Sequence, residues 1–150
     1  MELPQISLQS AARRYVAAAW FAASGALATV GLFLPLSKTG HFVLLYVALP
    51  AFSAGIAGYF WGGAILETSR VNTYGGAALR GLAVSTGAYA IFSLLFACGL
   101  PLLEAGWSIR QAPSFLLFSL TFGVLLTGPV VLAVGMIAGS SLFALKRYFQ

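Results

Sequence analysis

The chain alternates between long apolar runs and short polar segments. The runs cover residues 15–37, 42–66, 81–103 and 114–145, and all eleven Lys, Arg, Asp and Glu residues lie outside them. A bilayer core is about 30 Å thick, and a helix needs about 20 apolar residues to cross it. Each run is long enough. The pattern therefore predicts an all-α integral membrane protein, a four-transmembrane-helix bundle made of one membrane domain.

The composition agrees with this pattern. Hydrophobic residues make up 60% of the chain and charged residues 7%, whereas about a quarter of the residues of a soluble domain are charged. The net charge of +5 could indicate nucleic-acid binding, but no basic cluster exceeds two residues. The basic residues instead stand at the ends of the apolar runs, which is typical of membrane orientation. We therefore expect no nucleic-acid partner.

The basic residues also predict the orientation. Six of the eight fall on one side of the membrane if both termini are cytoplasmic: Arg13, Arg14, Arg70, Arg80, Lys146 and Arg147. The positive-inside rule places that side in the cytoplasm. The segment 67–80 is then a cytoplasmic loop, and the segment 104–113 is an outer loop. We expect a multi-pass protein of the plasma (inner) membrane.

Small residues recur at helical spacing in the second and fourth runs. Such residues let helix backbones approach closely in lipid, where no hydrophobic force drives helices together. They indicate either an interface with another subunit or packing within one bundle, which is the commoner role. The predicted helix-interface residues are Ala48, Ala51, Gly55, Gly58 and Gly62 in the second run, and Thr121, Gly128, Gly135 and Gly139 in the fourth.

The third run carries hydroxyl groups on one side. Thr86, Tyr89 and Ser93 stand at positions i, i+3 and i+7, which share a helix face. They could line a polar pathway for a solute. The commoner role of such residues is hydrogen bonding between helices, which is worth less than about 1–2 kcal/mol in membranes.

The segment 67–80 contains the polar residues that are the strongest candidates for contacts with a partner or with lipid headgroups. Glu67 and Arg70 can pair at i, i+3 on a helix, and Asn72 and Arg80 follow them. The arginines suit anionic lipid headgroups or a cytoplasmic partner. An ordinary positive-inside loop is the plainer interpretation. The segment lacks the lysine of a phosphate-binding loop, so no nucleotide site is expected.

Catalytic residue types are scarce. The chain has one histidine, His41, one cysteine, Cys98, and no aspartate. Zinc sites need three or four clustered ligands, and hydrolytic enzymes need clustered acid–base groups. We therefore expect no catalytic residues, no metal site, no cofactor and no enzymatic activity.

Two functions remain open at this point. The first is a non-enzymatic accessory or assembly subunit that packs against other membrane helices, or against copies of itself, through its small residues. The alternative is an oligomeric channel, transporter or flippase component for a small uncharged solute or a lipid. A cavity lined by Thr86 and Tyr89 would favour transport. A filled bundle with an exposed glycine face at Gly55, Gly58 and Gly62 would favour a partner interface. Membrane lipids are partners in either case.

Overall fold

The computed structural model describes residues 4–33, 47–67, 71–103 and 108–148, and these form helices and turns without any strand. Arg70 and parts of the predicted first and second runs lie outside the described residues, as do residues 104–107 of the predicted outer loop. The elements are α1 (Pro4–Phe33), α3 (Leu49–Trp61), the 3-10 turn η3 (Gly62–Ile65), α4 (Tyr74–Leu103), the 3-10 turn η4 (Ile109–Gln111), α5 (Ala112–Phe118), the π-helical turn η5 (Ser119–Gly123) and α6 (Val124–Tyr148).

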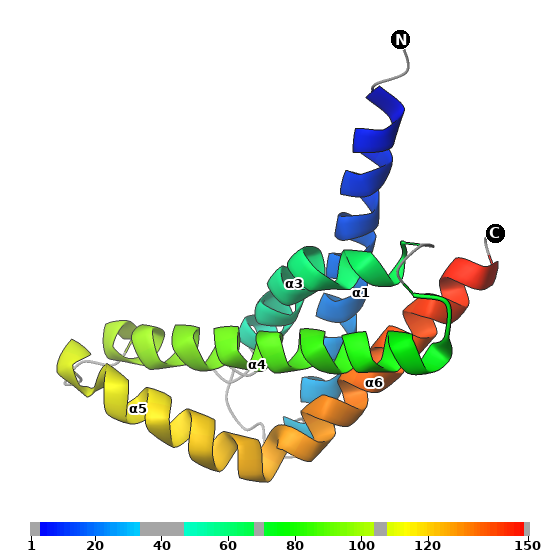
Figure 1. The fold of residues 1–150 in the computed structure, drawn as a ribbon. Coiled ribbons are helices and arrows are strands. Elements are labelled where there is room, and N and C mark those ends of the chain that lie inside the picture. Colours follow the sequence, from blue (N-terminus) through cyan, green and yellow to red (C-terminus); the bar gives the residue numbers. More distant parts are fainter. Residues whose placement is uncertain (1–3, 34–46, 68–70, 104–107, 149–150) are drawn as a thin grey trace.

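The helices are arranged as two closely packed pairs. Helix α1 packs along α3, and α4 packs along α6, while α3 lies beside α4 and connects the pairs. Figure 1 shows α1 crossing α4 at a steep angle, with its N-terminal end projecting beyond the other helices. Helix α1 also contacts α6, so this contact too connects the two pairs.

Two helices in the described part of the chain are long and apolar enough to cross a membrane. They span Tyr74–Gly99 in α4 and Thr127–Lys146 in α6, and Ala112–Thr121 forms a shorter apolar helix. The first of these spans contains Arg80, whose side chain is only half-buried. By length and composition, α4 and α6 are therefore compatible with a membrane.

Helix α4 begins at Tyr74, within the segment 67–80 that the sequence assigns to a loop. Thr73 explains this early start. Its hydroxyl accepts a hydrogen bond from the Gly76 amide at 3.1 Å, and its carbonyl accepts one from Ala77 at 3.0 Å. Such capping satisfies amides that a helix N-terminus otherwise leaves unpaired. Gly75 and Gly76 therefore lie in the first turn of the helix.

The fourth apolar run is interrupted rather than continuous. It begins as α5, widens into the π-helical turn η5 and continues as α6, which contains Pro129. A proline removes a main-chain hydrogen bond and bends its helix, and π-helical turns cause bends as well. Figure 1 shows the chain turning sharply between the yellow α5 and the later part of α6. The bend lets α5 approach one end of α4 while α6 crosses the other.

Helices α1 and α3 meet through the small residues predicted in the second run. A methyl group on Gly58 would lie 2.9 Å from the Ala17 carbonyl oxygen, and one on Gly62 would lie 3.1 Å from the Ala17 side chain. One on Gly55 would lie 3.4 Å from Ala22. These three glycines thus face the same chain's first helix, whereas Ala48 is exposed.

Helices α4 and α6 cross at glycines from both sides. A methyl group on Gly81 would collide with the Gly135 carbonyl, and one on Gly139 would collide with the Ala77 carbonyl. On Gly135 it would collide with Ser85. Because glycine has no side chain, the two backbones can approach closely here, which maximises van der Waals contact. Gly135 and Gly139 therefore pack within the chain.

Thr121 and Gly128 belong to the same predicted strip but lie apart from this crossing. Thr121 is exposed, and its hydroxyl donates to the Leu117 carbonyl of its own helical stretch at 2.8 Å. The nearest atom to a methyl group on Gly128 would belong to Val124, one turn earlier, at 3.5 Å. Their role at a partner interface stays a prediction.

Candidate functional site

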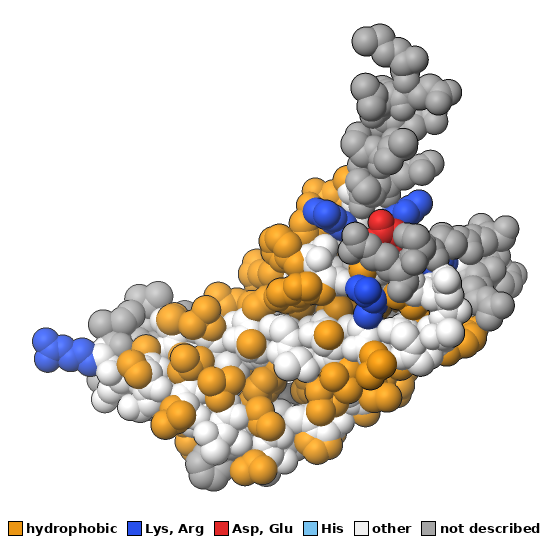
Figure 2. Space-filling view, in the orientation of Figure 1, with side chains coloured by type: hydrophobic (Ala, Val, Ile, Leu, Met, Phe, Trp, Pro, Cys, Tyr) orange, Lys and Arg blue, Asp and Glu red, His pale blue; other side chains and the backbone are white. Residues whose placement is uncertain are grey.

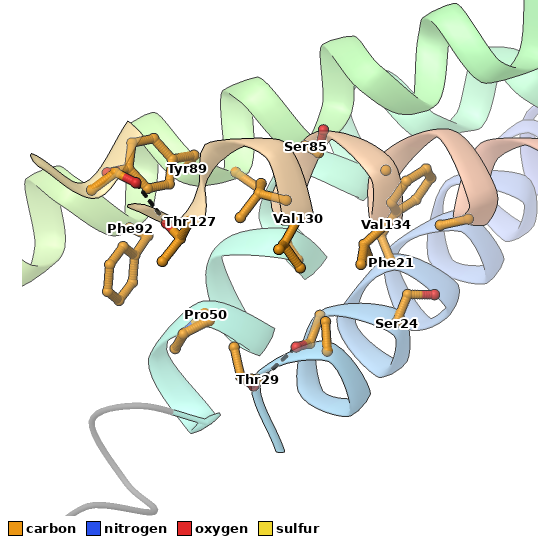
Figure 3. A pocket seen from close by; sticks show the side chains of 18 of the residues that line it. Phe21, Ser24, Thr29, Pro50, Ser85, Tyr89, Phe92, Thr127, Val130 and Val134 are labelled. Atoms are coloured by element: carbon orange, nitrogen blue, oxygen red, sulfur yellow. Dashed lines mark hydrogen bonds between the residues drawn. The ribbon is translucent and has the colours of Figure 1, made fainter. Parts of the chain in front are cut away.

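A cavity of about 360 Å³ lies between the two helix pairs. Helices α1, α3, α4, α5 and α6 and the turn η5 all contribute to its wall. Figure 3 shows Thr127 and Val130 of α6 pointing across the space towards Pro50 of α3 and Thr29 of α1. The cavity is partly open to its surroundings. Because both helix pairs contribute to its wall, the shape of the cavity depends on how the two pairs pack together.

The wall of the cavity is mainly apolar. Its apolar lining side chains include Phe21, Phe92, Phe96, Phe118, Val130 and Val131. No described Lys, Arg, Asp or Glu lines it. Apolar surface removed from water is stabilised by about 25 cal/mol per Å², so such a wall favours hydrocarbon over a hydrated solute.

The hydroxyl groups in the wall are directed back to the protein. Four of them donate to a main-chain carbonyl of their own helical segment three or four residues earlier, at 2.8 to 2.9 Å. The pairs are Ser24 with Trp20, Thr29 with Gly25, Ser85 with Leu82, and Thr127 with Gly123. Because their hydrogens are already donated, these groups offer a bound molecule no free donor. The apolar character of the wall is thereby preserved.

One end of the cavity is built around the π-helical turn η5. The Tyr89 hydroxyl of α4 donates to the Ser119 carbonyl, and the Ser119 hydroxyl donates to that of Ser93 at 3.0 Å. A side chain at Gly123 would collide with the Tyr89 hydroxyl, so glycine makes the contact possible. The π-helical turn is a rare conformation that often occurs at functional sites. Here the turn provides the carbonyl and hydroxyl through which α4 is hydrogen-bonded to the fourth run.

The predicted hydroxyl face of the third run is divided by the structure. Tyr89 lines the cavity, while Ser93 is fully buried behind it. Thr86 is exposed, lies outside the cavity wall and donates to the Leu82 carbonyl of its own helix at 2.9 Å. Two of the three residues therefore make contacts between helices, and the three do not line one continuous path.

The predicted cytoplasmic contacts are also separated. Glu67 is half-exposed at the end of α3 and η3, and Asn72 is exposed before α4. Arg80 lines a different, smaller groove between α3 and α4. Arg70 lies outside the described residues. These placements leave their roles as predictions.

Most cavity residues were not predicted from the sequence. Phe21 and Ser24 come from the first run and Val130 from the fourth, and nothing in their local pattern distinguishes them from other apolar helix positions. Ser85 is an exception, because it follows Gly81 of the helix crossing by four residues, and small residues at this spacing indicate close helix packing. That signal matches Gly135 and Gly139 across the crossing.

The described residues include no group of three or more His, Cys, Asp or Glu that could hold a metal ion. The fold and the cavity thus define a class: an all-helical protein whose described residues include two helices long and apolar enough for a membrane and an apolar space between helices. No family model, curated protein or solved structure matches this chain.

Proposed function

We propose that this chain is a non-enzymatic, multi-pass membrane protein that holds an apolar molecule, such as a lipid acyl chain, in its cavity. The observation that carries the proposal is the apolar wall, whose hydroxyl donors are all directed to main-chain or serine oxygens. A hydrated solute would lose hydrogen bonds on entry, whereas hydrocarbon would lose none. Lipid handling is thus favoured over the passage of a polar solute.

The proposal includes four spans with both termini in the cytoplasm. The basic residues at the ends of the apolar runs support this orientation. Helices α1 and α3 would complete the bundle beside α4 and α6, because α1 is long and largely apolar and α3 continues into η3. An acyl chain could then enter laterally from the bilayer, without crossing a polar barrier.

Photolabelling tests the cavity. A fatty acid carrying a photoactivatable diazirine is added to membranes that contain the full chain, and labelled residues are mapped by mass spectrometry. We expect labels on Phe92 and Val131 inside the cavity. Labels restricted to outward-facing residues such as Leu125, which is 71% exposed, would contradict the proposal.

A matched pair of variants sharpens this test. Val130→Trp places a large side chain in the cavity, whereas Leu132→Trp changes a position of similar exposure outside its wall. Val130 is 36% exposed and Leu132 is 37% exposed, and both lie on α6. We expect the first variant to lose most of the labelling of Phe92 and the second to keep it.

Assembly with other membrane helices is a second candidate, favoured by one observation. Thr121 and Gly128 belong to the predicted small-residue strip; Thr121 is exposed, and a methyl group on Gly128 would meet only Val124 of its own helical stretch among the described residues. They could receive a helix of another subunit or of a second copy. Gly128→Leu should then reduce the size of the complex in mild detergent, measured by light scattering. An unchanged size would rule out this surface.

A further inference from the structure

A second groove lies between α3 and α4 and has a volume of about 310 Å³. It shares no lining residue with the apolar cavity. Its lining residues are Phe60, Trp61, Ala64, Arg80, Ala83 and Gly87. The groove therefore combines exposed aromatic rings, small residues and a single cation.

Trp61 forms one wall of this groove because Gly87 leaves space for it. A methyl group on Gly87 would lie 2.7 Å from the Trp61 ring, too close for any other residue without a shift. Trp61 nevertheless remains 50% exposed, and Phe60 is 66% exposed. Tryptophan rings are favoured at the boundary between headgroups and hydrocarbon. The groove thus has the composition of a membrane interface.

Arg80 stands at one end of the groove. Its guanidinium has no hydrogen bond or ion pair with any residue that the structure describes, and the side chain is half-buried. From Arg80, the small residues Ala83 and Gly87 continue along α4 for about 10 Å at 1.5 Å per residue. A guanidinium matches a phosphate group well, since it can donate two parallel hydrogen bonds.

Other basic side chains surround this end of the molecule. Arg14 packs on Gly63 of η3, with its guanidinium carbon 6.0 Å from the Tyr59 ring centre. Figure 2 shows basic side chains gathered around the region where α1, α3 and α4 meet, with an acidic side chain among them, and another basic side chain at the far left end of the molecule. Glu67 is the one acidic residue of the described part, so positive charge predominates there. This field attracts anions.

We propose that this groove binds an anionic phospholipid, with the phosphate at Arg80 and the first acyl carbons along Ala83, Gly87 and the Trp61 ring. The Arg80 guanidinium, which pairs with none of the residues that the structure describes, supplies the charge complement, and the small residues leave room for hydrocarbon beside it. A zwitterionic lipid would fit the same space but would gain less from the surrounding positive charge. The site thus selects a lipid class independently of the cavity.

Quenching of tryptophan fluorescence by brominated lipids tests the proposal. The full chain is reconstituted into phosphatidylcholine vesicles with increasing fractions of brominated phosphatidylglycerol or brominated phosphatidylcholine. The chain has three tryptophans, so the Trp61 signal is the difference between the wild type and Trp61→Phe. We expect half-maximal quenching of Trp61 at an about five-fold lower fraction of the anionic lipid, because one basic residue near the surface contributes about 1 kcal/mol.

Arg80→Gln should remove most of this preference, and Arg80→Lys should retain more of it. Arg110→Gln is the control, since Arg110 is exposed and lies outside the groove. Ala83→Leu fills the groove at an exposed position and should weaken quenching by both lipids. Three results would overturn the proposal: equal quenching of the wild type by both lipids, a preference that survives undiminished in Arg80→Gln, or a Trp61 that neither lipid quenches. Photolabelling of the cavity would remain unaffected by Arg80→Gln.

Discussion

The hydroxyl of Tyr89 donates a hydrogen bond to the main-chain carbonyl of Ser119, which lies in the π-helical turn η5. A π-helical turn pairs each carbonyl with the amide five residues later, so its carbonyls do not follow the regular α-helical pattern. Tyr89 thereby ties α4 to the least regular point of the fourth run. It also closes one end of the cavity.

Tyr89→Phe should destabilise the protein by about 0.6 kcal/mol, and by no more than about 1.7 kcal/mol, which is the range measured for hydrogen bonds between membrane helices. The ring stays in place while the donor is lost. The free energy of unfolding can be measured by titration with a denaturing detergent. Thr86→Val is the matched control, since the Thr86 hydroxyl bonds only to its own helix. Equal effects of the two variants would contradict a bridging role for Tyr89.

The crossing of α4 and α6 should be intolerant of added volume. In Gly139→Ala, the new methyl group would meet the Ala77 carbonyl and the Gly81 backbone. We expect a loss of about 1–3 kcal/mol in the free energy of unfolding, the usual cost of overpacking. For Gly99→Ala we expect a stabilising effect instead, because a methyl group on Gly99 would meet no other atom within 4 Å. Alanine there should stabilise α4 by about 0.5–1 kcal/mol.

The indole of Trp20 connects the first helix to the last. It donates to the Ala138 carbonyl at 3.1 Å and lies 3.3 Å from the Ser141 hydroxyl. Trp20→Phe should lower the free energy of unfolding by about 0.5–1.5 kcal/mol, because the buried carbonyl loses a donor. A double-mutant cycle with Ser141→Ala measures the part due to the hydroxyl. Additive losses would show that Ser141 contributes nothing to this contact.

The small-residue strips show how far the sequence could predict packing. Regular spacing identified Gly58 and Gly62, as well as Gly135 and Gly139, as positions where backbones approach. It could not identify the helix that each strip faces, since that depends on how four segments are arranged in space. The structure places α1 against the first strip and Gly81 of α4 against the second.

The cavity could not be predicted in the same way. Its wall combines Phe21, Thr29, Pro50 and Val130 from three helices that are distant in sequence. The space between the helices results from the bend near Pro129 and from the angle between the two pairs. Neither the size of the bend nor this angle can be read from the spacing of residues along the sequence. A proline such as Pro129 indicates that its helix bends, but not which residues face each other across the bend.

Labelling of single cysteines tests the predicted orientation directly. Asn72 and Ser108 are exposed and lie before and after the span Tyr74–Gly99, so they should face opposite sides of the membrane. In a Cys98→Ala background, which removes the chain's only thiol, each position is replaced by cysteine. A membrane-impermeant maleimide applied to intact cells should label Ser108→Cys within minutes and Asn72→Cys only after the membrane is permeabilised. The reverse pattern would place the termini outside and would contradict the orientation inferred from the basic residues. Labelling of both positions in intact cells would show that α4 does not cross the membrane.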